Sequence, residues 1–124
     1  MPRRKVPDSL SLAVGDRIRT LRHEEGMTIE QLAQESEAGS KGHLSSIERG
    51  LVRPNIYTLQ RVADGLGVKP LDLMTFPKRS LREKVVDLTR RLKENRLRAL
   101  FRQLLEWLVG RRPSSARSAS PRDL

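Results

Sequence analysis

Helix start and stop signals recur at short intervals between residues 10 and 76, and they constrain the fold more than any other feature. Thr28 and Gln31 have the spacing of a capping box, Ser40 and Asn55 are good N-caps, and Pro70 suits a first helical turn. Glycines stand at three positions where helices commonly close, namely Gly26, Gly50 and Gly67. Apolar residues between these signals lie three or four positions apart, without strict alternation. The pattern predicts an all-α domain of five short helices.

The five expected helices occupy successive ranges of the chain. The first runs from about Ser11 to Glu25, the second opens at residue 28, and a turn over residues 36–39 leads to the third, within residues 40–50. The fourth begins near residue 55 and ends at residue 67, and a brief fifth helix is expected to bury Leu71 and Met74. The apolar residues expected in the core are Val14, Ile18, Leu21, Leu32, Ala33, Leu44, Ile47, Leu59, Val62, Ala63 and Leu66.

A second helical region follows Pro77. Ser80 and Glu83 again have capping-box spacing, and a first apolar stripe contains residues 81, 85, 88 and 92. A second stripe, out of phase with the first, contains residues 97, 100, 101, 104, 105 and 108. We therefore favour two helices joined by a tight turn at Lys93–Arg96, a helical hairpin, over one long bent helix.

The chain thus divides into four expected regions. Residues 1–9 are expected to form a disordered basic arm, and residues 10–76 the five-helix domain. Residues 77–110 are expected to form the basic amphipathic hairpin. Residues 111–124 are rich in Ser, Arg and Pro and are expected to be a disordered tail.

Net charge is unevenly distributed. The chain carries +10 overall, but residues 10–76 contain eight basic and nine acidic residues, whereas residues 77–112 contain twelve basic and four acidic ones. A positive excess favours an anionic partner such as a nucleic acid. The basic side chains expected to supply this attraction include Arg82, Lys84, Arg90, Arg91, Arg98 and Arg102. A solvated face that keeps the hairpin soluble and a surface for an acidic protein partner are the alternatives.

Several classes of function are not expected. The chain has no cysteine, its two histidines lack the spacing of a metal site, and we find no nucleophile–base pair and no phosphate-cradling loop. We therefore expect no enzyme activity, no metal and no cofactor. No apolar run approaches the roughly 18 residues needed to cross a bilayer, so we expect no membrane partner and a cytoplasmic location.

Separate motifs between residues 12 and 76 occur in the order found in one known family. They are Ile18-x-x-Leu21-Arg22, Leu32-Ala33, Leu44-Ser45-x-Ile47-Glu48-x-Gly50, Pro54, and Ala63-x-x-Leu66-Gly67-Val68. Together they span just over half of the chain and resemble the lambda-repressor-like (Cro/cI, XRE) helix-turn-helix family. The resemblance implies that the third helix lies in the major groove of double-stranded DNA while the second crosses the backbone.

The resemblance also implies roles for individual residues. Base contacts are assigned to Lys41, Gly42 and Ser46, and phosphate contacts to Ser40, His43, Arg53 and Asn55. Arg22 and Glu48 match a buried ion pair that ties the first helix to the third. Short side chains on the third helix would let its backbone approach base edges, and Lys41 can reach guanine acceptors. We expect Arg17, Arg19 and Arg61 on solvated helix faces.

The chain departs from the family pattern in two places. Ile29 stands where glutamine is common at the start of the second helix. The turn between the second and third helices is one residue longer than usual and lacks the usual apolar residue after Gly39.

The second stripe of the hairpin is too apolar to face water. Phe101, Leu104, Leu105 and Leu108 are expected to form a dimer interface, because regulators of this kind read two half-sites with two-fold symmetry. Packing against the chain's own domain and binding to a membrane surface are the alternatives.

These observations predict a sequence-specific DNA-binding transcription regulator, a repressor that binds a near-palindromic operator as a homodimer. An antitoxin-type regulator, whose hairpin binds a partner protein, is one alternative. The other is a protein-interaction adaptor that has lost DNA binding, which the −1 charge of residues 10–76 favours.

Overall fold

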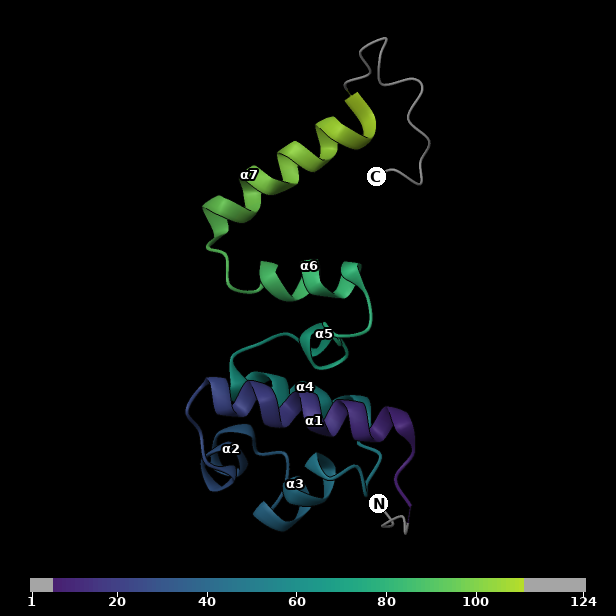
Figure 1. Cartoon of the computed structure of the whole chain (residues 1–124). Coiled ribbons are helices and arrows are strands. Elements are labelled where there is room, and N and C mark those ends of the chain that lie inside the picture. The colour runs from purple at the N-terminus through teal and green to yellow at the C-terminus, as the bar shows by residue number, and fades with distance from the viewer. Residues whose placement is uncertain (1–5, 111–124) are drawn as a thin grey trace. The chain divides into compact units, whose positions relative to one another are not determined.

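The computed structural model describes residues 6–110, which form helices and no strand (Figure 1). The elements are α1 (Ser9–Glu24), α2 (Ile29–Ser36), α3 (Lys41–Glu48), α4 (Ile56–Leu66), α5 (Pro70–Leu73), α6 (Leu81–Thr89), α7 (Glu94–Leu105) and the π-helical segment η1 (Glu106–Gly110). The predicted all-α class is confirmed. The chain divides into two compact units, one reaching Arg90 and the other beginning at Arg91.

Side-chain caps start the helices where the sequence predicts them. Thr28 and Gln31 form the capping box of α2, Ser40 accepts a hydrogen bond from the His43 N–H, and Asn55 accepts one from Thr58. Because the free N–H groups of a first turn need such acceptors, these residues set where α2, α3 and α4 begin.

The start of α1 differs from expectation. Asp8 caps this helix by accepting a hydrogen bond from the Ser11 N–H at 2.8 Å. Asp8 and Ser9, which we assigned to a disordered arm, are therefore part of an ordered helix start. Residues 1–5 of that arm and the whole predicted tail at 111–124 lie outside the described residues.

A single apolar core lies among the first five helices. Its buried members are Val14, Ile18, Leu21, Leu32, Ala38, Leu44, Ile47, Val52, Val62, Ala63, Leu66 and Leu73. The prediction for α5 is wrong: Leu71 and Met74 are exposed, whereas Leu73 is fully buried. A four-residue helix is only about one turn long, so apolar periodicity does not determine which side faces the core.

Close backbone contact joins α1 to α3. A Cβ atom at Gly15 would lie 2.4 Å from the Ile47 carbonyl oxygen and 2.5 Å from that of Glu48. Only glycine fits at this distance. The absent side chain therefore allows α1 to lie directly against α3 (Figure 1).

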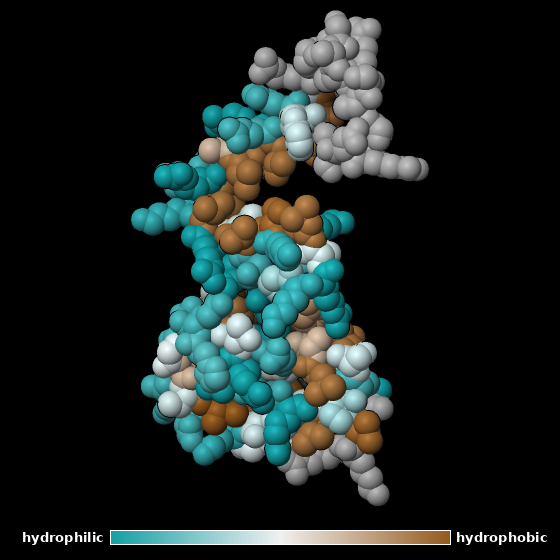
Figure 2. All heavy atoms as spheres, in the orientation of Figure 1, coloured by the Kyte–Doolittle hydropathy of each residue, from teal (hydrophilic) through white to brown (hydrophobic). Residues whose placement is uncertain are grey.

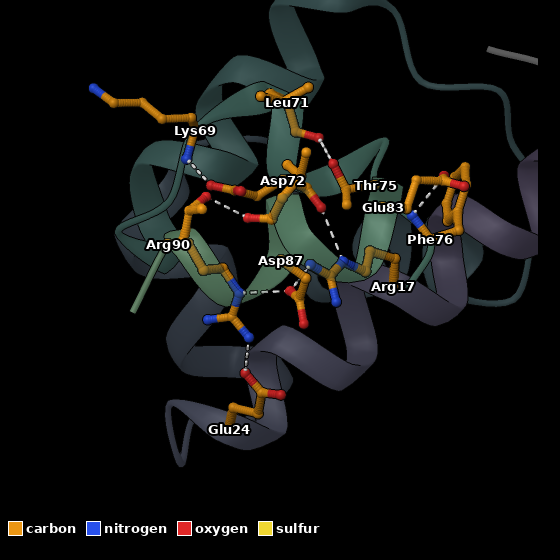
Figure 3. Close-up of polar contacts among 12 residues, drawn as sticks. Arg17, Glu24, Lys69, Leu71, Asp72, Thr75, Phe76, Glu83, Asp87 and Arg90 are labelled. Carbon is orange, nitrogen blue, oxygen red and sulfur yellow. Dashed lines mark hydrogen bonds and ion pairs between the residues drawn. The ribbon is translucent and has the colours of Figure 1, made fainter. Parts of the chain in front are cut away.

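The first compact unit extends past the boundary we expected after Phe76. It includes α6, which ion pairs join to α1: Arg17 binds Asp87, and Arg90 binds Glu24 (Figure 3). Arg17 is only 6% exposed, so its expected place on a solvated face is wrong. The break between the two C-terminal helices falls at residues 90–93, slightly before the predicted turn at 93–96.

Candidate nucleic-acid interface

The turn between α2 and α3 has an unusual backbone that positions α3. Glu37 closes α2 in the left-handed region at φ 54°, a conformation that glycine adopts at lower cost. Ala38 is buried in the core and Gly39 follows at φ 129°. The apolar anchor that the sequence lacks after Gly39 is thus supplied one residue before it, by Ala38.

Helix α3 has one buried and one exposed side. Leu44 and Ile47 are fully buried, as predicted, while Lys41 and Gly42 are exposed. Ser45, one helical turn after Lys41, is half-buried on the same side. The exposed side at the start of α3, consisting of Lys41, Gly42 and Ser45, is called the reading face below.

Ser46 does not lie on the reading face, so our expectation that it faces outward is wrong. It is only 4% exposed. The chain turns back after α3: the Leu51 N–H donates to the Ser46 carbonyl at 2.9 Å, and Val52 enters the core. Ser45 is the polar residue that we did not select, and its spacing of four from Lys41 is the sequence signal that identifies it.

Lys41 pairs with a carboxylate on α2. Its Nζ atom lies 2.6 Å from Glu30 Oε1, and both side chains are more than half exposed. The hydrogen bond from Lys41 is the largest of the effects that lower the pKa of Glu30. An exposed ion pair of this kind contributes little to stability, so Lys41 can exchange Glu30 for another acceptor.

Of the four residues expected to contact phosphate, Ser40 and Asn55 are helix N-caps, Arg53 precedes α4, and His43 lies in the first turn of α3. Ser40 and Asn55 use side-chain oxygens as caps, which leaves the Ser40 hydroxyl proton and the Asn55 amide protons as donors. His43 is half-buried, and its ring lies where a Cβ on Gly39 would point. Arg53 is exposed, but its Nε atom lies 2.9 Å from the carboxylate of Asp8. The terminal Nη groups of Arg53 carry the further N–H donors that a phosphate contact would use.

The predicted ion pair between α1 and α3 is present. Glu48 accepts hydrogen bonds from Arg22 Nε at 2.7 Å and Nη2 at 3.0 Å, and Arg22 Nη1 donates to the Met27 carbonyl at 2.9 Å. The hydrogen bond to Glu48 is the main cause that raises the pKa of Arg22. Arg19 adds a weaker contact to Glu48 at 3.5 Å, which we did not predict. The pair fixes the C-terminal end of α3 on the core.

An apolar face is exposed along α7 and η1. Phe101, Leu104, Leu105 and Leu108, the residues predicted to form an interface, are each at least 42% exposed. Trp107 and Val109, which we did not include, are exposed as well. Figure 2 shows apolar side chains gathered on this helix among hydrophilic ones.

Residues 6–110 contain neither a cluster of metal-ligating side chains nor a membrane-spanning helix. No group of three or more His, Cys, Asp or Glu side chains lies close enough there to hold a metal ion. None of the helices in this part of the chain has the length and apolarity to cross a membrane.

Similarity to known proteins covers the helix-turn-helix region. Residues 13–75 match the family model described as a helix-turn-helix domain. A helix-turn-helix-type transcriptional regulator of Sinorhizobium fredii is 41% identical over 63 residues, which cover 50% of this chain and 79% of the relative. The immunity repressor protein of Bacillus phage phi105 is 38% identical over 58 residues, which cover 47% of this chain and 40% of the repressor.

A solved structure has a similar fold. The clp gene regulator ClgR of Corynebacterium glutamicum is 33% identical in sequence, with a TM-score of 0.51. The match covers 54% of this chain and 86% of the ClgR chain.

Proposed function

This chain belongs to the helix-turn-helix domain family of DNA-binding transcription regulators, and from this membership we propose that it binds a near-palindromic operator as a homodimer and represses transcription. The observation that supports the proposal best is the reading face of α3. Its residues Lys41 and Gly42 are exposed and Ser45 is half-buried, while the opposite side of α3 is held by the core and by the Arg22–Glu48 pair.

The chemistry of the reading face suits base recognition. Gly42 has no side chain, so the first turn of α3 can approach the edges of base pairs. Lys41 can donate to the O6 and N7 atoms of guanine once it leaves Glu30, and Ser45 can donate to or accept from a neighbouring base. Ser45 replaces Ser46 in our assignment of base contacts.

Phosphate contacts would hold the reading face in place. Ser40 and Asn55 stand at the N-termini of α3 and α4, where free N–H groups and the helix dipole favour an anion. His43, in the first turn of α3, and Arg53, two residues before Asn55, add further donors. Such contacts set the position and register of a protein on DNA but carry no sequence information.

The apolar face of α7 and η1 supports the homodimer. An exposed face of this size on a water-soluble domain needs a partner surface. A second copy provides one and also supplies the second reading face that a two-fold symmetric operator requires.

The basic C-terminal third supports a general attraction to DNA. Arg82, Lys84 and Arg102 are exposed. Arg90, which we assigned to this attraction, is instead only 13% exposed and bound to Asp87 and Glu24. The remaining cations would release counterions on binding, and each phosphate contact adds about 0.9 to the slope of log affinity against log salt.

The test is selection of duplexes from a random-sequence library by the purified full-length protein, followed by titration of the selected sequence. We expect an inverted repeat to be enriched and bound by two copies. Lys41→Ala should weaken binding to it by roughly 5- to 150-fold, equivalent to about 1–3 kcal/mol. Lys69→Ala, which removes an exposed lysine from the N-terminus of α5, is the control and should bind as the wild type does.

The second candidate function is the protein-interaction role. The exposed apolar face of α7 and the −1 charge of residues 10–76 favour it. Failure to enrich any sequence, with a folded protein, would support this role against the DNA-binding proposal.

A further inference from the structure

The carboxylate of Glu30 lies beside the reading face and binds the lysine of that face. Glu30 is the second residue of α2, a helix that contacts α3 (Figure 1). Its Oε1 atom lies 2.6 Å from Lys41 Nζ, and the side chains of Glu30 and Lys41 are 57% and 61% exposed. An acidic side chain therefore stands at the edge of a surface that we propose to bind a polyanion.

Glu30 also occupies the N-terminus of α2. Hydrogen bonds from Lys41, from the Glu30 backbone N–H and from the Thr28 hydroxyl lower the pKa of the Glu30 carboxyl, so this group is ionised near neutral pH. Free N–H groups and the helix dipole favour an anion at the start of a helix. Here the protein supplies that anion itself, and a DNA phosphate at the start of α2 would have to displace it or lie next to it.

The residue before Glu30 gives a phosphate no alternative partner. Ile29, the first residue of α2, is half-buried and packs against the core. The sequence departs from the family pattern at this position, where glutamine is common. The start of α2 thus presents an apolar side chain and a carboxylate, and neither of them can donate a hydrogen bond to a phosphate.

Glu30 affects the two kinds of acceptor on DNA differently. The Lys41 ammonium can donate to the O6 and N7 atoms of guanine or to a charged phosphate oxygen. A phosphate oxygen that shares this ammonium with Glu30 would lie within about 5–6 Å of the carboxylate, because a charge-assisted hydrogen bond is about 2.8 Å long. Two negative charges at this separation repel each other, and they lie well inside the Debye length of about 10 Å at 0.1 M salt. Guanine has no net charge and meets much weaker repulsion.

We propose that Glu30 is a specificity-determining residue, which keeps Lys41 from binding phosphates and so weakens non-specific DNA binding more than operator binding. The inference rests on the proposed function, because it requires that Lys41 contacts guanine in the operator. Specificity is a difference between two affinities, so a charge that opposes the wrong partner raises specificity just as a contact with the right partner does.

The experiment measures the affinity of the full-length protein over a range of salt concentrations for two duplexes of equal length. One is the selected inverted repeat, and the other consists of alternating A·T base pairs and contains no guanine. In Glu30→Gln, Lys41 loses its carboxylate partner and can bind a phosphate of the A·T duplex. The slope of log affinity against log salt on that duplex should steepen by about 0.9 for each copy bound, which corresponds to about eightfold in affinity at 0.1 M salt.

The selected repeat should respond less to the same substitution. Lys41 binds guanine there with or without Glu30, so the slope should stay as in the wild type. The affinity should rise by less than about threefold for each copy bound, because an exposed ion pair is weak and its loss changes little. Glu30→Gln should also melt as the wild type does, for the same reason.

Two further variants separate this effect from a general change in charge. Glu35→Gln makes the same change of charge at an exposed position in the last turn of α2, and both slopes should stay as in the wild type. In a Lys41→Ala background, Glu30→Gln should steepen the slope on the A·T duplex by less than about 0.3, because the lysine that would bind the phosphate is absent.

Three kinds of result would overturn the inference. An unchanged slope of Glu30→Gln on the A·T duplex would show that Glu30 does not keep Lys41 from phosphates, while leaving the proposed function intact. Equal gains on both duplexes, or the same gain in Glu35→Gln, would make Glu30 a contributor to general charge and not a determinant of specificity. A wild-type protein that selects no inverted repeat would refute the proposed function and, with it, the role of Glu30.

Discussion

Replacing Glu48 by alanine should unfold the protein more readily and weaken DNA binding only as a consequence. Glu48 is 3% exposed at its side chain and accepts two hydrogen bonds from Arg22, whose side chain is 11% exposed. Removing one partner of a buried pair typically costs about 3–5 kcal/mol, because the other charge stays buried without a counterion. Arg22 keeps its bond to the Met27 carbonyl, so we expect the low end, about 3 kcal/mol.

Thermal melting of the full-length protein is the assay. For a domain of this size each kcal/mol lowers the melting temperature by about 4–8 °C, so Glu48→Ala should melt roughly 12–24 °C below the wild type. Glu48→Gln keeps an acceptor but not the charge and should lose about half as much stability. Glu35→Ala, at an exposed position of α2, is the control and should change stability by less than about 0.5 kcal/mol. A Glu48→Ala protein that melts like the wild type but no longer binds DNA would refute the structural role and place Glu48 in the DNA contact.

The remaining predictions concern the backbone and the apolar face. Gly15→Ala should destabilise the fold by about 1–3 kcal/mol in urea unfolding, because its Cβ would meet the Ile47 and Glu48 carbonyl oxygens. Gly42→Ala is the control and should not destabilise the fold, since its nearest new neighbour is Ser40 Oγ at 3.8 Å. Equal effects of the two substitutions would contradict the close packing of α1 on α3. Glu37→Gly should stabilise the protein by roughly 0.5–1 kcal/mol in the same assay, because glycine adopts the left-handed backbone at φ 54° without the strain that a side chain causes. A loss of stability would show that contacts of the Glu37 side chain outweigh this strain. Leu105→Glu places a charge on the exposed apolar face and should convert the dimer into a folded monomer in sedimentation experiments. A wild-type protein that already sediments as a monomer would contradict the proposed homodimer.

Much of the first unit could be predicted because its signals are local. Caps such as Thr28, Ser40 and Asn55 act on N–H groups two or three residues away, so the sequence contains both partners. The core of the longer helices follows from periodicity, which fails for the single turn of α5, where Leu73 is buried in place of Leu71. The Arg22–Glu48 pair was predicted from the family resemblance alone.

Contacts between distant segments could not be predicted in the same way. Ser46 looks like a polar surface residue in the sequence, but its side chain is buried in the folded chain. Asp87 and Arg90 have the spacing of an ordinary solvated pair within one helix, and nothing near them indicates that Arg17 lies against Asp87. The boundary expected after Phe76 was therefore too early, because long-range ion pairs attach α6 to the first unit.

Site-directed cleavage of DNA tests most directly whether the reading face of α3 lies on DNA. The chain has no cysteine, so Arg49→Cys, at an exposed position directly after α3, can carry a single iron chelate that cuts nearby DNA. Lys69→Cys, at the exposed N-terminus of α5, provides the control position. On the selected duplex we predict two symmetry-related clusters of cuts from residue 49, with centres about one helical turn or a multiple of it apart, and much weaker cutting from residue 69. Equal and scattered cutting from both positions would contradict the account, because α3 would then have no fixed place on the DNA.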